Sequence, residues 1–226
     1  MEMELSSDDF MNRIPLLKDP DHFGFSIKLL NEKPAIVHIH NLLNPVECQH
    51  IINLARPKLT SSTMIVNNVE TVNPSRSSSS AFLTQNGELP TNDAIIHRFL
   101  SRLSKFTGYP VSHFEGMKVV NYKKSQQYLA HYDFFREHTN FTKESGDRQF
   151  TFFVYLNTLP EEAGGYTAFP NLNLKVKPSL GDAVFWTNMD FAGKYYEETL
   201  HAGEPVLTDV EKWGINVWIR EKSYQK

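Results

Sequence analysis

RQFTFFVYLN, residues 148–157, is the stretch that decides the fold class of this chain. Its aromatic and β-branched residues suit a pleated, half-buried surface and predict a strand. Further runs of this kind, separated by turn residues such as Gly, Pro and Asn, lie at residues 116–122, 127–131, 172–178, 182–186, 199–206 and 212–220. Many short strands joined by turns predict a β-sandwich or a jelly roll.

Two helices are predicted ahead of most of these strands. Asn44, with Glu47 three residues later, has the pattern of a capping box and marks a helix start after a strand at residues 35–40. The expected apolar face of this helix contains Val46, Ile51, Leu54 and Ala55. A second helix runs from Asn92 to Lys105, has apolar residues at helical spacing, and ends before Gly108. We expect both helices to cover one sheet.

The composition is that of one globular domain. Hydrophobic residues make up 40% of the 226 residues, and the net charge is −3. The chain has no basic stripe and no run of like charge, so no nucleic-acid partner is expected. Residues 1–34 have little periodicity and are predicted to be an N-terminal extension of a catalytic domain at residues 35–226.

The surroundings of the protein are only weakly constrained by its sequence. A single cysteine, Cys48, excludes an intramolecular disulfide. We find no signal peptide and no apolar run that could span a membrane, so no membrane partner is expected, and the protein is expected to be cytoplasmic if the chain is complete. The oligomeric state is not determined, and a monomer is compatible with the sequence.

The pattern His131-Tyr132-Asp133 is a candidate metal site. Side chains two residues apart on a strand point to the same side, so an imidazole and a carboxylate converge there. His201, on a later predicted strand, is the natural third ligand. Two histidines and one carboxylate form the iron(II) face that leaves positions open for a bidentate co-substrate and for dioxygen.

Two other pairs could contribute metal ligands. His113 and Glu115 are two residues apart, and so are His38 and His40. Surface or packing histidines are the favoured interpretation of both pairs, because the downstream context supports the motif at His131 instead.

That context is Lys212, which lies eleven residues after His201 at the start of the last predicted strand. A dicarboxylate co-substrate chelates iron at one end, and its other carboxylate needs a cation to compensate for its desolvation. Taken alone, Lys212 would be interpreted as a solvated charge. After the spaced metal motif, it indicates a dicarboxylate site.

Several ordered blocks of the sequence resemble the prolyl 4-hydroxylases, a family of iron(II)- and 2-oxoglutarate-dependent dioxygenases. The blocks are VNY at 120–122, QYLAHYD at 127–133, GGYTAFP at 164–170, GDAVFW at 181–186, and the run from His201 to Trp218. Upstream, Arg76-Ser77-Ser78 resembles the family's Arg-Thr-Ser substrate loop. The resemblance covers about residues 35–221, and several blocks in order are more specific than any single motif.

The resemblance implies a mainly β fold with flanking helices, namely a double-stranded β-helix, or jelly-roll barrel. It implies 4-hydroxylation of prolyl residues in a peptide or protein, with Fe(II), 2-oxoglutarate, O2 and ascorbate, and with succinate and CO2 as products. The roles it implies are iron binding by His131, Asp133 and His201; 2-oxoglutarate binding by Lys212, Tyr122 and Thr167; pocket lining by Tyr128, Arg148 and Trp218; and a substrate loop at Arg76, Ser77 and Ser78.

The chain departs from the family pattern at two positions. Ser77 replaces the threonine of the substrate loop, and Arg220 stands where the animal and plant enzymes typically have a histidine. The second change bears on substrate choice more than on iron chemistry. Two loops, Thr60–Ser80 and Arg136–Asp147, are predicted to be mobile without peptide and to close over an extended, proline-containing segment.

Two other classes of function remain open on the sequence. One is a 2-oxoglutarate oxygenase that acts on another side chain, a free amino acid or a nucleobase. The other is a non-catalytic jelly roll that binds a metal or a sugar. A basic groove would favour nucleic acid, and loss of a ligand or of Lys212 would favour the non-catalytic protein.

Overall fold

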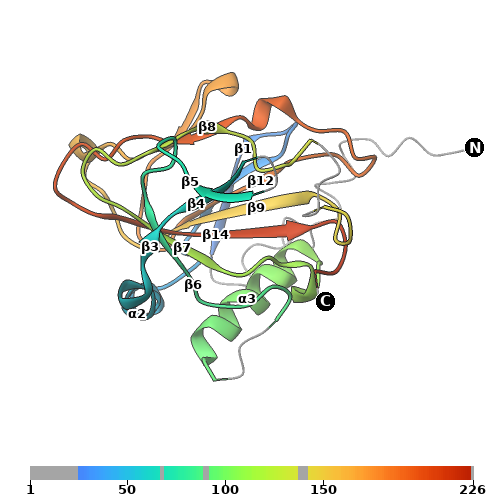
Figure 1. The fold of residues 1–226 in the computed structure, drawn as a ribbon, viewed down its shortest axis with the longest axis horizontal. Helices are drawn as coiled ribbons and strands as arrows, with labels where there is room; N and C mark the ends of the chain where they lie inside the picture. The colour runs from blue at the N-terminus through green and yellow to red at the C-terminus, as the bar shows by residue number, and fades with distance from the viewer. Residues whose placement is uncertain (1–24, 67–68, 89–91, 137–141, 225–226) are drawn as a thin grey trace, which may run out of the picture.

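The fold is built on one large antiparallel sheet and a smaller one that faces it (Figure 1). The computed structural model describes residues 25–66, 69–88, 92–136 and 142–224. In spatial order the large sheet contains β1 (Ser26–Asn31), β2 (Ile36–His40), β12 (Ala183–Thr187), β9 (Arg148–Tyr155), β14 (Lys212–Arg220), β7 (Lys118–Tyr122), β6 (Ser79–Phe82) and β3 (Thr60–Ser61). The smaller sheet contains β11 (Leu174–Val176), β10 (Thr167–Phe169), β13 (His201–Gly203) and β8 (Tyr128–His131).

The large sheet is buried on both faces, which explains the nearly continuous apolar run of β9. Phe152 and Val154 face one cluster, whereas Phe153 and Tyr155 face another. The second cluster lies between the two sheets, because it also contains Phe169 and Val176 of the small sheet. Alternating side chains of one strand thus pack against two different layers.

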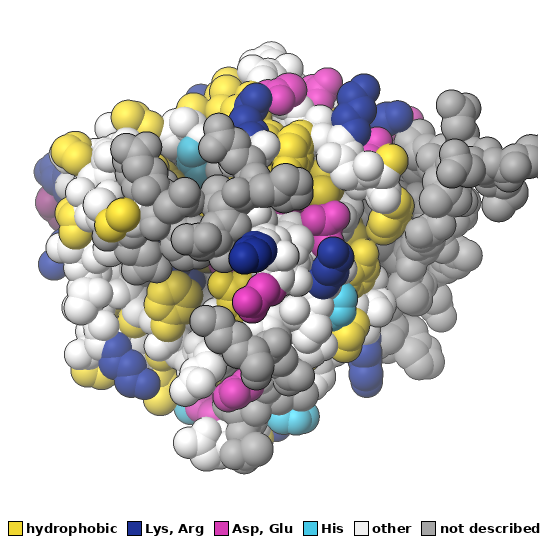
Figure 2. Space-filling view, turned by 45° about the vertical axis from the view of Figure 1, so that its right-hand side comes forward, with side chains coloured by type: hydrophobic (Ala, Val, Ile, Leu, Met, Phe, Trp, Pro, Cys, Tyr) yellow, Lys and Arg dark blue, Asp and Glu magenta, His cyan; other side chains and the backbone are white. Residues whose placement is uncertain are grey.

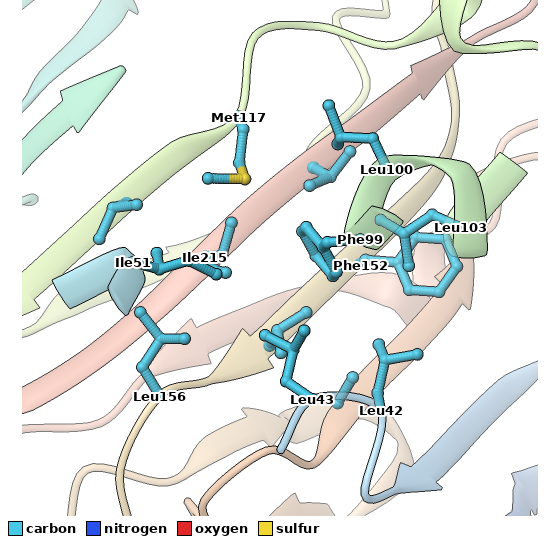
Figure 3. Packing of buried hydrophobic residues seen from close by; sticks show 14 of the residues in the cluster. Leu42, Leu43, Ile51, Phe99, Leu100, Leu103, Met117, Phe152, Leu156 and Ile215 are labelled. Carbon is cyan, nitrogen blue, oxygen red and sulfur yellow. The ribbon is translucent and has the colours of Figure 1, made fainter. Parts of the chain in front are cut away.

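Two helices cover the outer face of the large sheet, α2 (Pro45–Ala55) and α3 (Ala94–Thr107) (Figure 1). Phe99 and Leu103 of α3 and Ile51 of α2 pack against Phe152 and Ile215 of the central strands (Figure 3). The remaining elements are a hairpin of β4 (Thr63–Val66) with β5 (Val69–Val72), and the 3-10 turns η3 (Arg56–Lys58), η4 (Val111–His113), η5 (Glu161–Ala163), η6 (Pro170–Leu172) and η7 (Glu197–Thr199).

This arrangement confirms the prediction of a mainly β jelly roll with helices on one sheet. The capping box is present as well: Asn44 Oδ1 accepts the Glu47 N–H at 2.9 Å, and Glu47 Oε2 accepts the Asn44 N–H at 2.9 Å. Gly108, with a φ of 76°, ends α3 in the left-handed conformation that favours glycine.

Two predictions from the sequence were wrong. Val46 is 73% exposed, because the buried side of α2 follows Cys48, Ile51 and Ala55 instead. Residues 26–31, placed in the extension, form β1 and pair with β2, so the sheet begins before residue 35. Residues 1–24 lie outside the described part of the chain. None of the described helices has the length and apolarity needed to cross a membrane.

Candidate active site

The predicted metal ligands meet between two paired strands of the small sheet. His201 on β13 lies opposite His131 on β8, and Asp133 follows two residues after His131. His131 Nε2 is 3.8 Å from Asp133 Oδ1, and His201 Nε2 is 3.7 Å from Asp133 Oδ2. The three ligand atoms lie within 4.8 Å of one another, so one metal ion can reach all of them.

Backbone hydrogen bonds orient both imidazoles for metal binding. His131 Nδ1 lies 2.8 Å from the Leu129 carbonyl, and His201 Nδ1 lies 2.9 Å from the Thr199 carbonyl. Since a carbonyl only accepts, each Nδ1 carries a proton, and Nε2 is the nitrogen that the neutral ring offers to a metal. Burial, followed by the neighbouring His201, lowers the pKa of His131 to about 3, which keeps this imidazole neutral.

Asp133 is held by a chain of buried polar side chains. Thr151 Oγ1 donates to Asp133 Oδ2 at 2.8 Å, and Asn188 Nδ2 donates to Thr151 Oγ1 at 2.9 Å. Burial alone would raise the pKa of Asp133, but the neighbouring His201 and His131, the Arg148 guanidinium and the hydrogen bond from Thr151 hold it below its usual range. The donor set is therefore two unprotonated imidazole nitrogens and one carboxylate, which fits iron(II).

The three residues predicted to bind 2-oxoglutarate surround one pocket beside the histidines. Lys212 and Tyr122 are paired across β14 and β7, and Thr167 on β10 approaches from the small sheet. Tyr155, which no sequence motif indicates, donates from its hydroxyl to Thr167 Oγ1 at 2.8 Å. The Thr167 hydroxyl proton thus remains available for another acceptor.

Lys212 is a buried cation in aromatic surroundings. Lys212 is 1% exposed. Its Nζ lies 5.1 Å from the centre of the Phe153 ring and 5.4 Å from the centre of the Tyr122 ring. Among the described residues, its ammonium forms no ion pair with a carboxylate. Burial lowers the pKa of Lys212 to about 7, and the more distant Glu204 opposes this effect. A bound carboxylate would supply the missing counter-charge.

The turn at Gly164-Gly165 lies between the elements that carry Thr167 and Lys212. The two glycines have φ values of 62° and 69°. A Cβ on Gly165 would lie 2.7 Å from Leu159 Cδ1 and 3.4 Å from Lys212 Cδ. Both reasons for glycine, backbone conformation and space, therefore apply at Gly165.

The predicted substrate loop lies beside the iron motif. Arg76 forms a β-bridge with Tyr128, and its guanidinium lies 4.7 Å from the centre of the Tyr128 ring. That ring in turn stacks on His131, with centroids 3.6 Å apart. Ser77 and Ser78 have other partners: Ser77 Oγ pairs with Gln127, and Ser78 Oγ donates to Ser62 Oγ at 2.8 Å.

A groove with a volume of about 340 Å³ opens in front of the metal ligands. Arg148 and Trp218 both line it, and the Arg148 guanidinium lies 3.9 Å from the centre of the Trp218 ring. Arg148 also forms an ion pair with Glu115. The sequence did not indicate that Glu115 lies in the groove. Trp186 belongs to the core cluster between the sheets and also contacts His201, with ring centroids 4.7 Å apart, so it lies next to the site.

Neither of the two competing histidine pairs belongs to the cluster of His131, Asp133 and His201. His113 Nδ1 contacts the Arg220 carbonyl at 3.1 Å and is no part of the His131 cluster. His38 Nε2 and His40 Nδ1 lie 3.0 and 2.9 Å from Asp182 Oδ2, in a second group whose atoms could hold a metal. The Asp182 carboxylate is already bonded there by both rings and by the Asn41 N–H, at 3.0 Å, as packing histidines require.

The fold and the site together define a class of protein, the iron(II)- and 2-oxoglutarate-dependent oxygenases, which use O2 and are supported by ascorbate. The family model described as the 2OG-Fe(II) oxygenase superfamily matches residues 117–220. This match covers β7 to β14 and therefore includes all three predicted iron ligands and Lys212.

Individual relatives narrow the class. Probable prolyl 4-hydroxylase 3 from Arabidopsis thaliana is 32% identical over 88% of this chain and 73% of its own length. A putative prolyl 4-hydroxylase from Acanthamoeba polyphaga mimivirus is 33% identical over 85% of this chain and 76% of its own. The solved 2OG complex of viral collagen prolyl hydroxylase from Paramecium Bursaria Chlorella virus-1 has a TM-score of 0.63 and 30% identity, covering 82% of this chain and 95% of that one. This chain belongs to the prolyl 4-hydroxylase family.

Proposed function

We propose that this protein hydroxylates prolyl residues of a peptide or protein at carbon four, with 2-oxoglutarate as co-substrate. The main observation behind the proposal is that the Lys212 pocket and the groove meet at His131. The Lys212 pocket and the groove both border on this ligand, so a co-substrate and a peptide can approach the same metal ion. When bound, iron(II), 2-oxoglutarate and O2 supply the oxidising chemistry, with succinate and CO2 as products and ascorbate restoring iron oxidised in uncoupled turnovers.

The side chains of the pocket divide the remaining tasks. Lys212 neutralises the distal carboxylate of 2-oxoglutarate, and the hydroxyls of Tyr122 and Thr167 donate to it. Thr151 fixes the orientation of Asp133, so the metal-facing oxygens do not need to reorganise during turnover. Trp186 and Trp218 exclude water from the reacting atoms, since they are 1% and 5% exposed.

The groove suits a proline-containing segment. Aromatic residues contribute much of its lining, namely Phe82, Tyr128, Tyr132, Phe134, Phe135, Trp218 and Tyr224. Proline-rich segments favour the polyproline II conformation and dock into aromatic grooves with little loss of conformational entropy.

The test of the proposal is mass spectrometry of proline-rich peptides after incubation with the protein, iron(II), 2-oxoglutarate and ascorbate. We expect one added oxygen atom per modified proline, with an equal amount of succinate. Fragment spectra and comparison with a 4-hydroxyproline standard locate the hydroxyl. Succinate release that no peptide stimulates, with no oxygen added to any proline, would contradict the proposal.

A pair of histidine variants tests the iron ligands independently of the peptide. His131→Ala should lower iron affinity by at least the roughly 10–100-fold that is typical of residues supporting a metal ligand. His113→Ala is the matched control and should bind iron as the unmodified protein does. If the His113 variant lost iron in a titration and the His131 variant kept it, the assignment of His131 as the ligand would be wrong.

A further inference from the structure

The groove carries an excess of positive charge that the rest of the surface does not. The chain as a whole has a net charge of −3, and on the face shown in Figure 2 acidic and basic side chains are interspersed. Among the described residues that line the groove, the charged side chains are Arg76, Lys118, Arg148 and Arg220, against Glu115 and Asp133. The four cationic side chains outnumber the two carboxylates before any ligand is bound.

Both negative charges are already taken up within the protein. Glu115 accepts from Arg148 Nε at 2.7 Å and Nη2 at 2.8 Å, and its Oε1 lies 2.7 Å from Arg220 Nε. Burial alone would raise the pKa of Glu115, but these two guanidinium groups hold it below its usual range, so it stays ionised. The carboxylate of Asp133 faces the two histidines and belongs to the metal site.

Arg76 has no such carboxylate. It is 5% exposed, and its guanidinium donates one hydrogen bond within the described part of the chain, from Nη1 to the Thr63 carbonyl at 3.4 Å. Its buried Nε and Nη2 atoms have no hydrogen-bond partner among the described residues. A buried guanidinium without an anion is costly, because it has lost its hydration and gained nothing equivalent.

The two vacant nitrogens define the chemistry of the missing partner. Nε and Nη2 form one edge of the guanidinium, and Arg148 uses this same edge to bind Glu115. A carboxylate fits this edge with two parallel hydrogen bonds and also neutralises the charge. A backbone carbonyl offers one acceptor atom and no charge, so it would leave the excess positive charge of the groove uncompensated.

We propose that the substrate carries an acidic side chain close to the target proline and that Arg76 binds its carboxylate. This inference rests on the proposed prolyl hydroxylation and names its substrate class. The acidic residue lies within about three positions of the proline, since polyproline II advances about 3.1 Å per residue. Arg76 is connected to the iron ligand His131 through Tyr128, by contacts of 4.7 and 3.6 Å.

The first arm of the test compares proline peptides that differ at one position near the proline, which is Asp, Asn or Lys. Affinities are measured without turnover, by fluorescence anisotropy on iron-free protein. We expect the Asp peptide to bind roughly tenfold or more tightly than the Asn peptide, with the Lys peptide weakest, and the difference to shrink as salt is added. Equal affinities for the Asp and Asn peptides at low salt would overturn the inference.

The second arm is a double-mutant cycle. Arg76→Gln keeps a hydrogen-bond donor but removes the charge. It should therefore lower the affinity for the Asp peptide and leave the affinity for the Asn peptide nearly unchanged. An equal loss for both peptides would show that Arg76 binds the peptide backbone and would contradict the inference. Lys58→Gln, at an exposed lysine outside the groove, is the matched control and should keep the full Asp preference.

The same peptides separate this inference from the proposed function. Hydroxylation of all three with equal kcat/KM and equal affinity supports prolyl hydroxylation and contradicts the acidic preference. Tight, charge-dependent binding without hydroxylation of any peptide supports the acidic ligand and contradicts prolyl hydroxylation. If Arg76→Gln does not fold, the peptide series and its salt dependence on the unmodified protein still decide the question.

Discussion

At the scale of single residues, Lys212 is a buried cation whose counter-charge must come from a bound ligand. The ammonium is buried beside the rings of Tyr122, Phe153 and Tyr155, and Glu204 is the charged group that influences its pKa. Lys212→Ala should raise the KM for 2-oxoglutarate by two or more orders of magnitude, because breaking a buried charge pair costs roughly 3–5 kcal/mol. Lys175→Ala, at an exposed lysine paired with Glu204, is the control. An unchanged KM in the Lys212 variant would refute the assignment.

The same residue predicts a pH dependence. In the free protein the pKa of Lys212 is lowered to about 7, and a bound carboxylate favours the charged form and raises it. Binding of 2-oxoglutarate therefore takes up a proton above pH 7, and its KM should rise by up to roughly tenfold per pH unit there. Tyr122 and Tyr155 have raised pKa values and stay neutral in this range. Lys212→Arg should flatten the profile, because a guanidinium keeps its charge.

For Thr151 we predict an effect on iron affinity rather than on binding of the co-substrate. Thr151→Val removes the hydrogen bond to Asp133 and leaves the Asn188 amide without its acceptor. We expect iron affinity to fall by roughly 10–100-fold in a calorimetric titration. Thr107→Val removes another buried hydroxyl, which donates to the Leu103 carbonyl on α3, and should cost stability but no iron affinity. Equal iron affinities in the two variants would refute a positioning role for Thr151.

What the sequence could predict at this scale depends on the separation of the partners. His131 and Asp133 were found because a strand places residues two apart on one side. Thr151 supports Asp133 from a strand 18 positions later, and Glu115 meets Arg148 across 33 positions. No local periodicity encodes such pairs, so a single sequence without homologues does not reveal them. Lys212 was found only because the chemistry of a dicarboxylate required a cation.

At the scale of elements, the Gly164-Gly165 turn connects the fold to the pocket. Gly165→Ala combines a positive φ with a Cβ that crowds Leu159, so it should cost about 1 kcal/mol or more of stability and raise the KM for 2-oxoglutarate. Gly193 has a φ of 83° and no atom within 4 Å of an added Cβ. Gly193→Ala therefore isolates the backbone cost and should leave the KM unchanged. Thermal unfolding and KM measurements on both variants separate the two effects.

The elements themselves were largely predictable, and the errors have local causes. The capping box fixed the start of α2, but Val46 points to solvent because helix rotation is set by packing and by the contact of Glu47 with Arg102 of α3. That contact joins positions 55 residues apart. Strand β1 was missed because Ser26–Asn31 is half exposed at a sheet edge and its sequence lacks a buried alternation.

At the scale of the whole molecule, strand order is the part that sequence patterns do not supply. The predicted strands exist, yet β12 pairs with β2 and β9, and β14 pairs with β7 and β9. These neighbours are far apart along the chain, and they are selected by which apolar faces can be buried together. The jelly roll itself was predictable because that requirement leaves few solutions for many short strands.

The hairpin of β4 and β5 is the part of the molecule that we expect to move when peptide binds. It pairs with neither main sheet, Val69 and Val72 are 58% and 67% exposed, and Thr63 and Met64 line the groove. A two-stranded hairpin alone is only marginally stable, so peptide contacts should stabilise it. Residues 67–68 and 137–141, which belong to the two loops predicted to close, lie outside the described part of the chain.

Hydrogen exchange with and without a bound proline peptide measures this closure, on metal-substituted protein so that no turnover occurs. Amides of Thr63–Val66 and Val69–Val72 should exchange several-fold more slowly with peptide, because burying the hairpin raises the free energy of its local opening. Amides of β9 are the internal control, since this central strand is bonded on both sides in either state. If a peptide that the enzyme hydroxylates leaves exchange in the hairpin unchanged, the hairpin is no lid, and recognition occurs on the rigid rim of the two sheets.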